Sequence, residues 1–187
     1  MIKQTLLVLS SLLFLGSYAS AESKVASLIK YVDSYPFNAD PSKGIATPLV
    51  KDPIYQELIH QYLPAGLIAE LETLTVSSPI QLIEDRYLLI QTCEPHNCIH
   101  DAGVFIDTEQ QNILVFLRSG NIDDQANGMH CFSSNNWQLS EMSDTASKAF
   151  WKEMAFNYGI PEVAFRCYDK QHYKDYQAQP VVDFSNG

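Results

Sequence analysis

The sequence predicts an α+β fold, in which an antiparallel β-sheet is flanked by helices and carries a protruding, disulfide-closed loop. Apolar residues recur at helical spacing near the N-terminus and again late in the chain, whereas the middle of the chain has β-rich segments joined by short turns. Two cysteines, Cys93 and Cys98, enclose only four residues between two of these segments. Helices and antiparallel strands kept in separate stretches of the chain are typical of the α+β class.

The first 21 residues have the pattern of a secretory signal peptide. Lys3 precedes an apolar run from Leu6 to Leu15, and Ala19-Ser20-Ala21 supplies the small residues that precede a cleavage site. The run is shorter than the roughly 20 apolar residues that a membrane-spanning helix needs. We therefore expect cleavage after Ala21, and a periplasmic, soluble protein formed by residues 22–187 as a single domain.

The charge of the chain is strongly acidic, with 12 basic against 22 acidic residues. Cleavage would remove Lys3 and no acidic residue, which leaves 11 basic residues and a net charge near −11. This charge disfavours nucleic acid and anionic membranes as partners and favours a cationic protein. The sequence does not determine the oligomeric state, and a homodimer is one of the alternatives.

Two helices are expected before the sheet. Residues 22–35 place Val25, Leu28 and Val32 at helical spacing, and 52–62 form a helix with Asp52 as its N-cap and Pro53 in its first turn. The turn-rich segment 38–48 resembles a linker between them. The residues Leu63-Pro64-Ala65-Gly66 are predicted to turn the chain toward the sheet.

Strands follow from residue 71 onward. Residues 71–83 contain alternating β-type stretches broken near Pro79, and a turn at Glu84-Asp85 leads into 86–93. After the cysteine loop, 102–107 and 112–118 form a hairpin around residues 108–111. A weaker strand is expected at 129–134, an amphipathic helix at 144–158, a short strand at 162–168, and a loosely ordered tail from 172.

All four cysteines follow the signal peptide, so two disulfides are expected in an oxidising compartment, Cys93–Cys98 and Cys131–Cys167. On the chain-entropy model the short ring stabilises the fold by ~2 kcal/mol and the long bridge by ~4 kcal/mol. The short ring is therefore better explained as a device that holds Pro95 and His96 in one shape at the exposed edge of the sheet. The alternative is a stapled turn whose histidine is incidental.

A metal site is a further alternative, because Cys93, His96, Cys98 and His100 could supply four ligands. Against it, exported cysteines tend to oxidise, and zinc motifs usually combine two separated ligand pairs. Familiar catalytic and phosphate-binding motifs do not occur in the sequence. We expect a protein that is not an enzyme and that needs no cofactor.

The hexapeptide Cys93-Glu94-Pro95-His96-Asn97-Cys98 resembles the C-x-P-H-x-C loop of the inhibitors of vertebrate lysozyme, the periplasmic Ivy family. The upstream residues Leu63-Pro64-Ala65 resemble an LPA segment of that family, with Tyr87 at a similar place before the first cysteine. The resemblance covers roughly residues 52–118, so the N-terminal helix and the C-terminal tail would be additions.

In the Ivy family the disulfide-closed loop projects from an antiparallel sheet and enters the active-site cleft of lysozyme. The resemblance therefore implies that Cys93, Pro95, His96 and Cys98 form the target-binding loop, with His96 bonded to the two catalytic carboxylates. It also implies a cationic partner, a lysozyme or another muramidase. A charge-assisted hydrogen bond contributes ~1.5–3 kcal/mol, and a closed loop lowers the ordering cost of binding.

Two positions of the loop depart from the family pattern. Glu94 stands where the family usually has lysine, and Asn97 stands where it has aspartate. Glu94 should weaken binding to a carboxylate-lined cleft unless a basic residue of the target contacts it. The target could be a host lysozyme, a muramidase delivered by a rival bacterium, which would make this an immunity protein, or the cell's own lytic transglycosylase.

Overall fold

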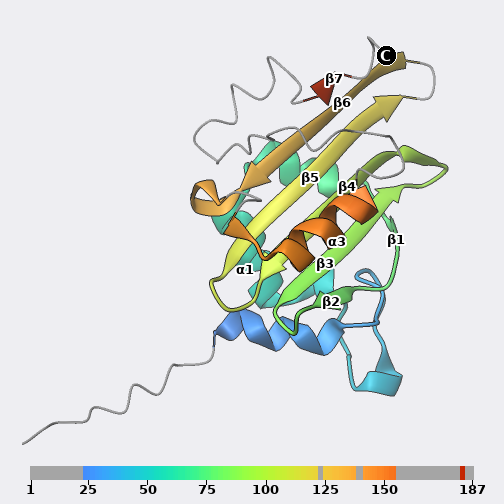
Figure 1. Ribbon diagram of the computed structural model, residues 1–187. Helices are drawn as coiled ribbons and strands as arrows, with labels where there is room; N and C mark the ends of the chain where they lie inside the picture. Colours follow the sequence, from blue (N-terminus) through green and yellow to red (C-terminus); the bar gives the residue numbers. More distant parts are fainter. Residues whose placement is uncertain (1–22, 122–123, 138–140, 155–181, 184–187) are drawn as a thin grey trace, which may run out of the picture.

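The computed structural model describes residues 23–121, 124–137, 141–154 and 182–183, and its fold is α+β, as predicted (Figure 1). The predicted signal peptide, residues 1–21, lies outside the described residues. In chain order the elements are the 3₁₀-helices η1 (Lys24–Tyr31), η2 (Pro41–Lys43) and η3 (Leu49–Lys51), the helices α1 (Pro53–Tyr62) and α2 (Ala65–Leu71), the strands β1 (Val76–Ser77), β2 (Gln81–Ile83), β3 (Tyr87–Glu94), β4 (Asn97–Asp107), β5 (Asn112–Asn121) and β6 (Asp124–Ser133), then η4 (Ser134–Asn136), α3 (Asp144–Met154) and β7 (Val182–Asp183).

The described strands form one seven-stranded antiparallel sheet in the order β1-β3-β4-β5-β6-β7. Successive hairpins join β3, β4, β5 and β6, and the short strands β1 and β2 both pair with β3. The predicted turn at Glu84-Asp85 is confirmed, and both residues have the left-handed φ of 54°. The hairpin around residues 108–111 is confirmed as well, with Asp107 facing Asn112.

Helices cover both faces of the sheet, with α3 in front of it and α1 behind it in Figure 1. The alternation of side chains along the strands explains the two layers of core. On β4, Val104 and Ile106 belong to the core cluster that includes α1 and α2, whereas Phe105 packs on the opposite face with Trp137 and Ala146. Because both faces of the central strands are buried, a shift of register by one residue would disrupt both cores.

The start of α1 was predicted correctly. The Asp52 carboxylate accepts a hydrogen bond from the backbone N–H of Ile54 at 2.8 Å, and Pro53 opens the helix. The same carboxylate accepts hydrogen bonds from the Tyr31 hydroxyl at 2.8 Å and from Lys30 Nζ at 2.9 Å. Asp52 therefore both caps α1 and ties it to η1, which is a 3₁₀-helix shorter than the helix expected at residues 22–35.

The prediction of a turn at residues 63–66 was wrong. Pro64, in an extended conformation, is the N-cap of α2, and the helix runs from Ala65 to Leu71. Leu67 and Ile68 are buried against the first core cluster. Pro and Gly favour turns, but Pro is also well tolerated where a helix starts. The apolar residues at positions 67, 68 and 71 have helical spacing and favour the helix here.

Four smaller expectations also need correction or lie outside the described residues. The segment 38–48 is no open linker, because Ile45 is buried and Asp40 pairs with it in an isolated bridge. Within the tail, β7 pairs with β6, so residues 182–183 are ordered. The strand expected at 162–168 and the last part of the helix expected at 144–158 lie outside the described residues.

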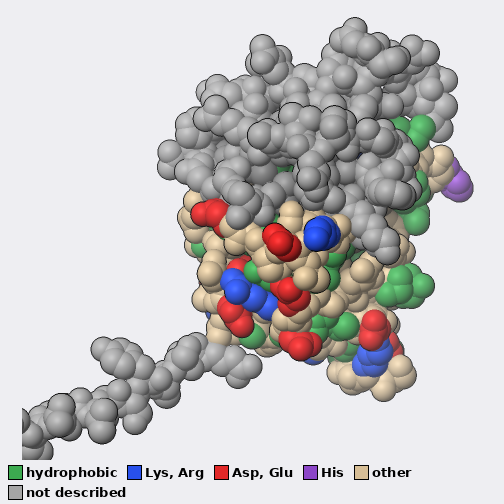
Figure 2. Space-filling view, viewed as in Figure 1, with side chains coloured by type: hydrophobic (Ala, Val, Ile, Leu, Met, Phe, Trp, Pro, Cys, Tyr) green, Lys and Arg blue, Asp and Glu red, His purple; other side chains and the backbone are tan. Residues whose placement is uncertain are grey.

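On the face drawn in Figure 2, acidic and basic side chains alternate over the described surface, without a region of one sign. Among the described residues, no helix is long and apolar enough to cross a membrane.

Candidate functional site

The candidate site is the tip of the hairpin between β3 and β4. Only Pro95 and His96 connect the strands, since Glu94 faces Asn97. Proline holds its own φ near −65°, and His96 has a φ of +65°, so the two residues have the φ signs of a type II turn. That turn usually has glycine at its second central position. A left-handed φ at a histidine costs ~1–2 kcal/mol of backbone strain. The closed ring holds the residue in this conformation.

The predicted disulfide between Cys93 and Cys98 is present, with 4.9 Å between the Cα atoms. Beneath the tip the register shifts, because Cys93 faces Asp101 while Glu94 faces Asn97. Cys98, Ile99 and His100 therefore form a bulge in β4 at the base of the ring. The covalent bond and the bulge together set the direction in which the turn projects.

The ring lies at one end of the sheet, and the prediction of a place at its edge was wrong. Strand β3 has β1 and β2 on one side and β4 on the other, and β4 also pairs with β5. In Figure 1 the tip of the hairpin projects to the right of the sheet. Pro95 and His96 are exposed, and within the described part of the chain no hydrogen bond or ion pair involves the His96 side chain. Its imidazole is thus presented to solvent.

The two positions that depart from the family pattern contact each other. The side-chain amide of Asn97 donates a hydrogen bond to Glu94 Oε2 at 3.0 Å. The same oxygen lies 3.4 Å from Nδ1 of His100, whose Nε2 lies 3.2 Å from Oε1 of Glu70 on α2. The Glu94 carboxylate therefore has partners within the protein, and His100 links the ring to α2.

An ion pair between the buried Arg118 and the partly exposed Asp101 supports the base of the ring from the next strand. Arg118 on β5 is only 2% exposed; its Nη2 donates to the backbone oxygen of Cys98 at 2.9 Å and to Asp101 Oδ2 at 2.6 Å. Burial raises the pKa of Asp101 to about 6, and the Arg118 guanidinium opposes this rise. Removing Asp101 would leave the buried Arg118 guanidinium without its partner, which is strongly destabilising.

Sequence reasoning missed these supporting residues. Asp101 and Arg118 face each other in the β4–β5 register, equally far from the hairpin loop. Opposite charges at mirrored positions of a predicted hairpin are the signal that could have identified the pair. Glu70 had no such signal, because its helix was not predicted.

The second predicted disulfide is described only in part. Cys131 is buried and disulfide-bonded, whereas Cys167, its predicted partner, lies outside the described residues. The metal alternative fits poorly, because the bond between Cys93 and Cys98 removes two of its four ligands. Among the described residues, no group of three or more His, Cys, Asp or Glu side chains is placed to hold a metal ion.

The site is thus an exposed histidine on a covalently closed turn, supported from below by the ion pair of Arg118 with Asp101 and from the side by α2. Comparisons with models of protein families, with curated proteins and with solved structures found no match to this chain.

Proposed function

We propose that this protein is a periplasmic inhibitor of lysozyme-type peptidoglycan hydrolases, which inserts His96 between the catalytic carboxylates of its target. The observation that supports the proposal most is an exposed histidine in a two-residue turn that a six-residue disulfide ring closes. Its φ of +65° is left-handed, as are the φ angles of Glu84 and Asp85 in the turn before β3, so the backbone conformation alone does not set this turn apart. The covalent closure does, because it holds the exposed imidazole in one place before any partner binds.

The chemistry of the target fits this geometry. Glycosidases of this kind hold two carboxyl groups on either side of the scissile bond, and one of them has a raised pKa. An imidazole has two ring nitrogens and can bond to one or both carboxyl groups when it is charged. Because the ring is closed before binding, little conformational entropy remains to be lost when the tip enters a cleft.

The proposal is tested by measuring inhibition against purified enzymes of the three candidate classes: a vertebrate lysozyme, a muramidase effector from a rival bacterium, and a lytic transglycosylase. Each enzyme is assayed on peptidoglycan with and without the protein, and complex formation is followed by size-exclusion chromatography. Inhibition in one class identifies the target, and inhibition of the effector alone would make the protein an immunity protein. Failure to bind or inhibit any of the three would contradict the proposal.

The rate of association with a cationic target is expected to fall as salt is added. The net charge of the full chain is −10, which attracts a cationic partner over a distance. The Debye length is ~10 Å at 0.1 M salt and becomes shorter as salt is added. Between 10 mM and 300 mM salt we therefore expect the on-rate to drop about tenfold or more. Stopped-flow measurements check this, and an on-rate that stays constant would exclude a role for the acidic charge.

Replacing Glu94 with lysine is expected to tighten inhibition about fivefold, because the change removes a negative charge that would face the carboxylates of the target. Changing Asn97 to aspartate in the same variant should preserve the gain, since facing positions of opposite charge support each other across the hairpin. Inhibition constants of E94K and of the double variant E94K/N97D check this. Weaker inhibition by both would mean that Glu94 contacts a basic residue on the target.

A further inference from the structure

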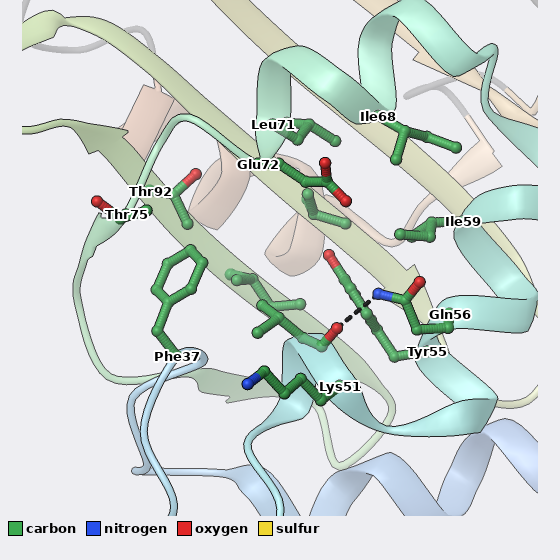
Figure 3. A pocket seen from close by; sticks show the side chains of 13 residues that line it. Phe37, Lys51, Tyr55, Gln56, Ile59, Ile68, Leu71, Glu72, Thr75 and Thr92 are labelled. Carbon is green, nitrogen blue, oxygen red and sulfur yellow. Dashed lines mark hydrogen bonds between the residues drawn. The ribbon is translucent and has the colours of Figure 1, made fainter.

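A cavity of about 350 Å³ lies on the face of the sheet that α1 and α2 cover (Figure 3). Its walls come from η3, α1, α2 and the strands β3 and β4, with Phe37 and Thr75 at its side. Protein interiors rarely contain voids much larger than a water molecule. A space of this volume is instead within the range of sites that hold small molecules.

The walls of the cavity are mainly apolar. Ile59, Ile68, Ile90 and Val104 line it and are all at least 94% buried. An apolar void of this kind gains nothing from water, which needs several polar partners to be held in place. An apolar molecule would restore the contacts that these side chains otherwise lack.

One buried polar group in the wall of the cavity has no partner among the described residues. Tyr55 on α1 is 6% exposed, and its hydroxyl takes part in no hydrogen bond within the described part of the chain. Figure 3 shows this hydroxyl directed into the cavity. Burial raises the pKa of Tyr55, so the hydroxyl keeps its proton and can donate it. The neighbouring Gln56 side chain is already engaged, because its amide donates to the backbone oxygen of Val50 at 2.5 Å.

The rim of the cavity carries one charge of each sign. Lys51 and Glu72 are both exposed, and in the described residues neither is engaged in an ion pair. In Figure 3 the two side chains lie on different sides of the opening. A ligand with a strong charge of either sign would be attracted by one of them and repelled by the other, so the rim suits an uncharged molecule.

We propose that this cavity binds a small, uncharged, mainly apolar molecule whose single hydrogen-bond acceptor accepts a hydrogen bond from the Tyr55 hydroxyl. The inference is independent of the proposed inhibition, because the cavity shares no residue with the ring. The protein would then have two sites: the ring for an enzyme and this cavity for a small molecule.

The first test uses the neutral fluorophore N-phenyl-1-naphthylamine, which brightens in apolar surroundings. Purified protein is expected to bind it with a stoichiometry of one, and two matched competitors should displace it: 2-acetylnaphthalene, which has a carbonyl acceptor, and 2-ethylnaphthalene, which has none. Tyr55→Phe removes only the hydroxyl. It should weaken the binding of 2-acetylnaphthalene about fivefold to tenfold, as expected for the loss of one hydrogen bond. The affinity for 2-ethylnaphthalene should change by less than twofold.

The second test fills the cavity. Leu71→Trp places a large ring at its wall and is expected to abolish fluorophore binding, whereas Tyr35→Trp, at an exposed position outside the lining, should leave binding unchanged. Circular dichroism shows whether each variant is folded. Absence of binding to the parent protein, binding that survives in folded Leu71→Trp, or equal effects of Tyr55→Phe on both competitors would each overturn the proposal. If Leu71→Trp does not fold, the comparison of the two competitors decides alone.

Discussion

Replacing His96 with alanine is expected to weaken inhibition of the target enzyme about thirtyfold or more, which corresponds to ~2 kcal/mol for a central hot-spot residue. The imidazole is the part of the ring that would reach the carboxylates, and no other described side chain at the tip could replace its two nitrogens. Since His96 is exposed and has no partner in the described part of the protein, its loss should change the midpoint of thermal unfolding by little. Inhibition constants and melting curves of the same preparation measure both effects.

The matched control is His60→Ala. His60 is an exposed histidine on α1, where its Nε2 lies 3.1 Å from Gln56 Oε1, and it is not part of the hairpin. This variant should inhibit as well as the parent protein. If His96→Ala also inhibits as well as the parent, the ring is a stapled turn and the histidine is incidental.

Opening the ring is expected to cause comparable damage by a different route. The double variant C93S/C98S removes the covalent bond without leaving a free thiol, so the strained turn relaxes and must be ordered again on binding. We expect inhibition to weaken about tenfold or more. The fold should also lose ~2 kcal/mol of stability, since the disulfide no longer restricts the unfolded chain.

The two variants therefore differ in a second measurement. A loss of ~2 kcal/mol lowers the unfolding midpoint of a protein of this size by roughly 4–8 °C, whereas His96→Ala should leave the midpoint almost unchanged. Full inhibition by C93S/C98S would show that rigidity of the ring has no part in recognition. An unchanged midpoint would show that Arg118 and the bulge alone hold the base of the ring.

Those parts of the fold that depend on neighbours in sequence were predictable. Asp52 and Pro53 mark the start of α1 by themselves, and the turns at Glu84-Asp85 and at residues 108–111 follow from the turn residues between apolar strands. Helix α2 was missed because Pro64 and Gly66 favour a turn as readily as a helix start. Only burial of Leu67 and Ile68 against the sheet decides between them, and burial is a property of the whole fold.

The candidate site was predictable to a similar degree. The spacing of Cys93, Pro95, His96 and Cys98 was enough to predict a closed turn that presents a histidine, and the fold confirms the disulfide and the exposure. The support given by Arg118 depends on the register between β4 and β5, and the contact between His100 and Glu70 depends on where α2 packs. The cavity around Tyr55 is formed by segments that lie far apart in the sequence, so no local pattern predicts it.

The packing of β3 and β4 on both faces bears on how this hairpin could evolve. Strand β4 is buried from Ala102 onward and β3 as far as Ile90, and the ring beyond them contributes no side chain to either core cluster. Residues 94–97 can therefore be exchanged while the scaffold keeps its register, as binding loops are exchanged on other rigid frameworks. A lineage that follows a changing target would alter positions 94 and 97 first, because His96 is the group proposed to bond to the catalytic carboxylates and Pro95 helps to set the turn. Because the side chains at positions 94 and 97 contact each other, those two should change in pairs.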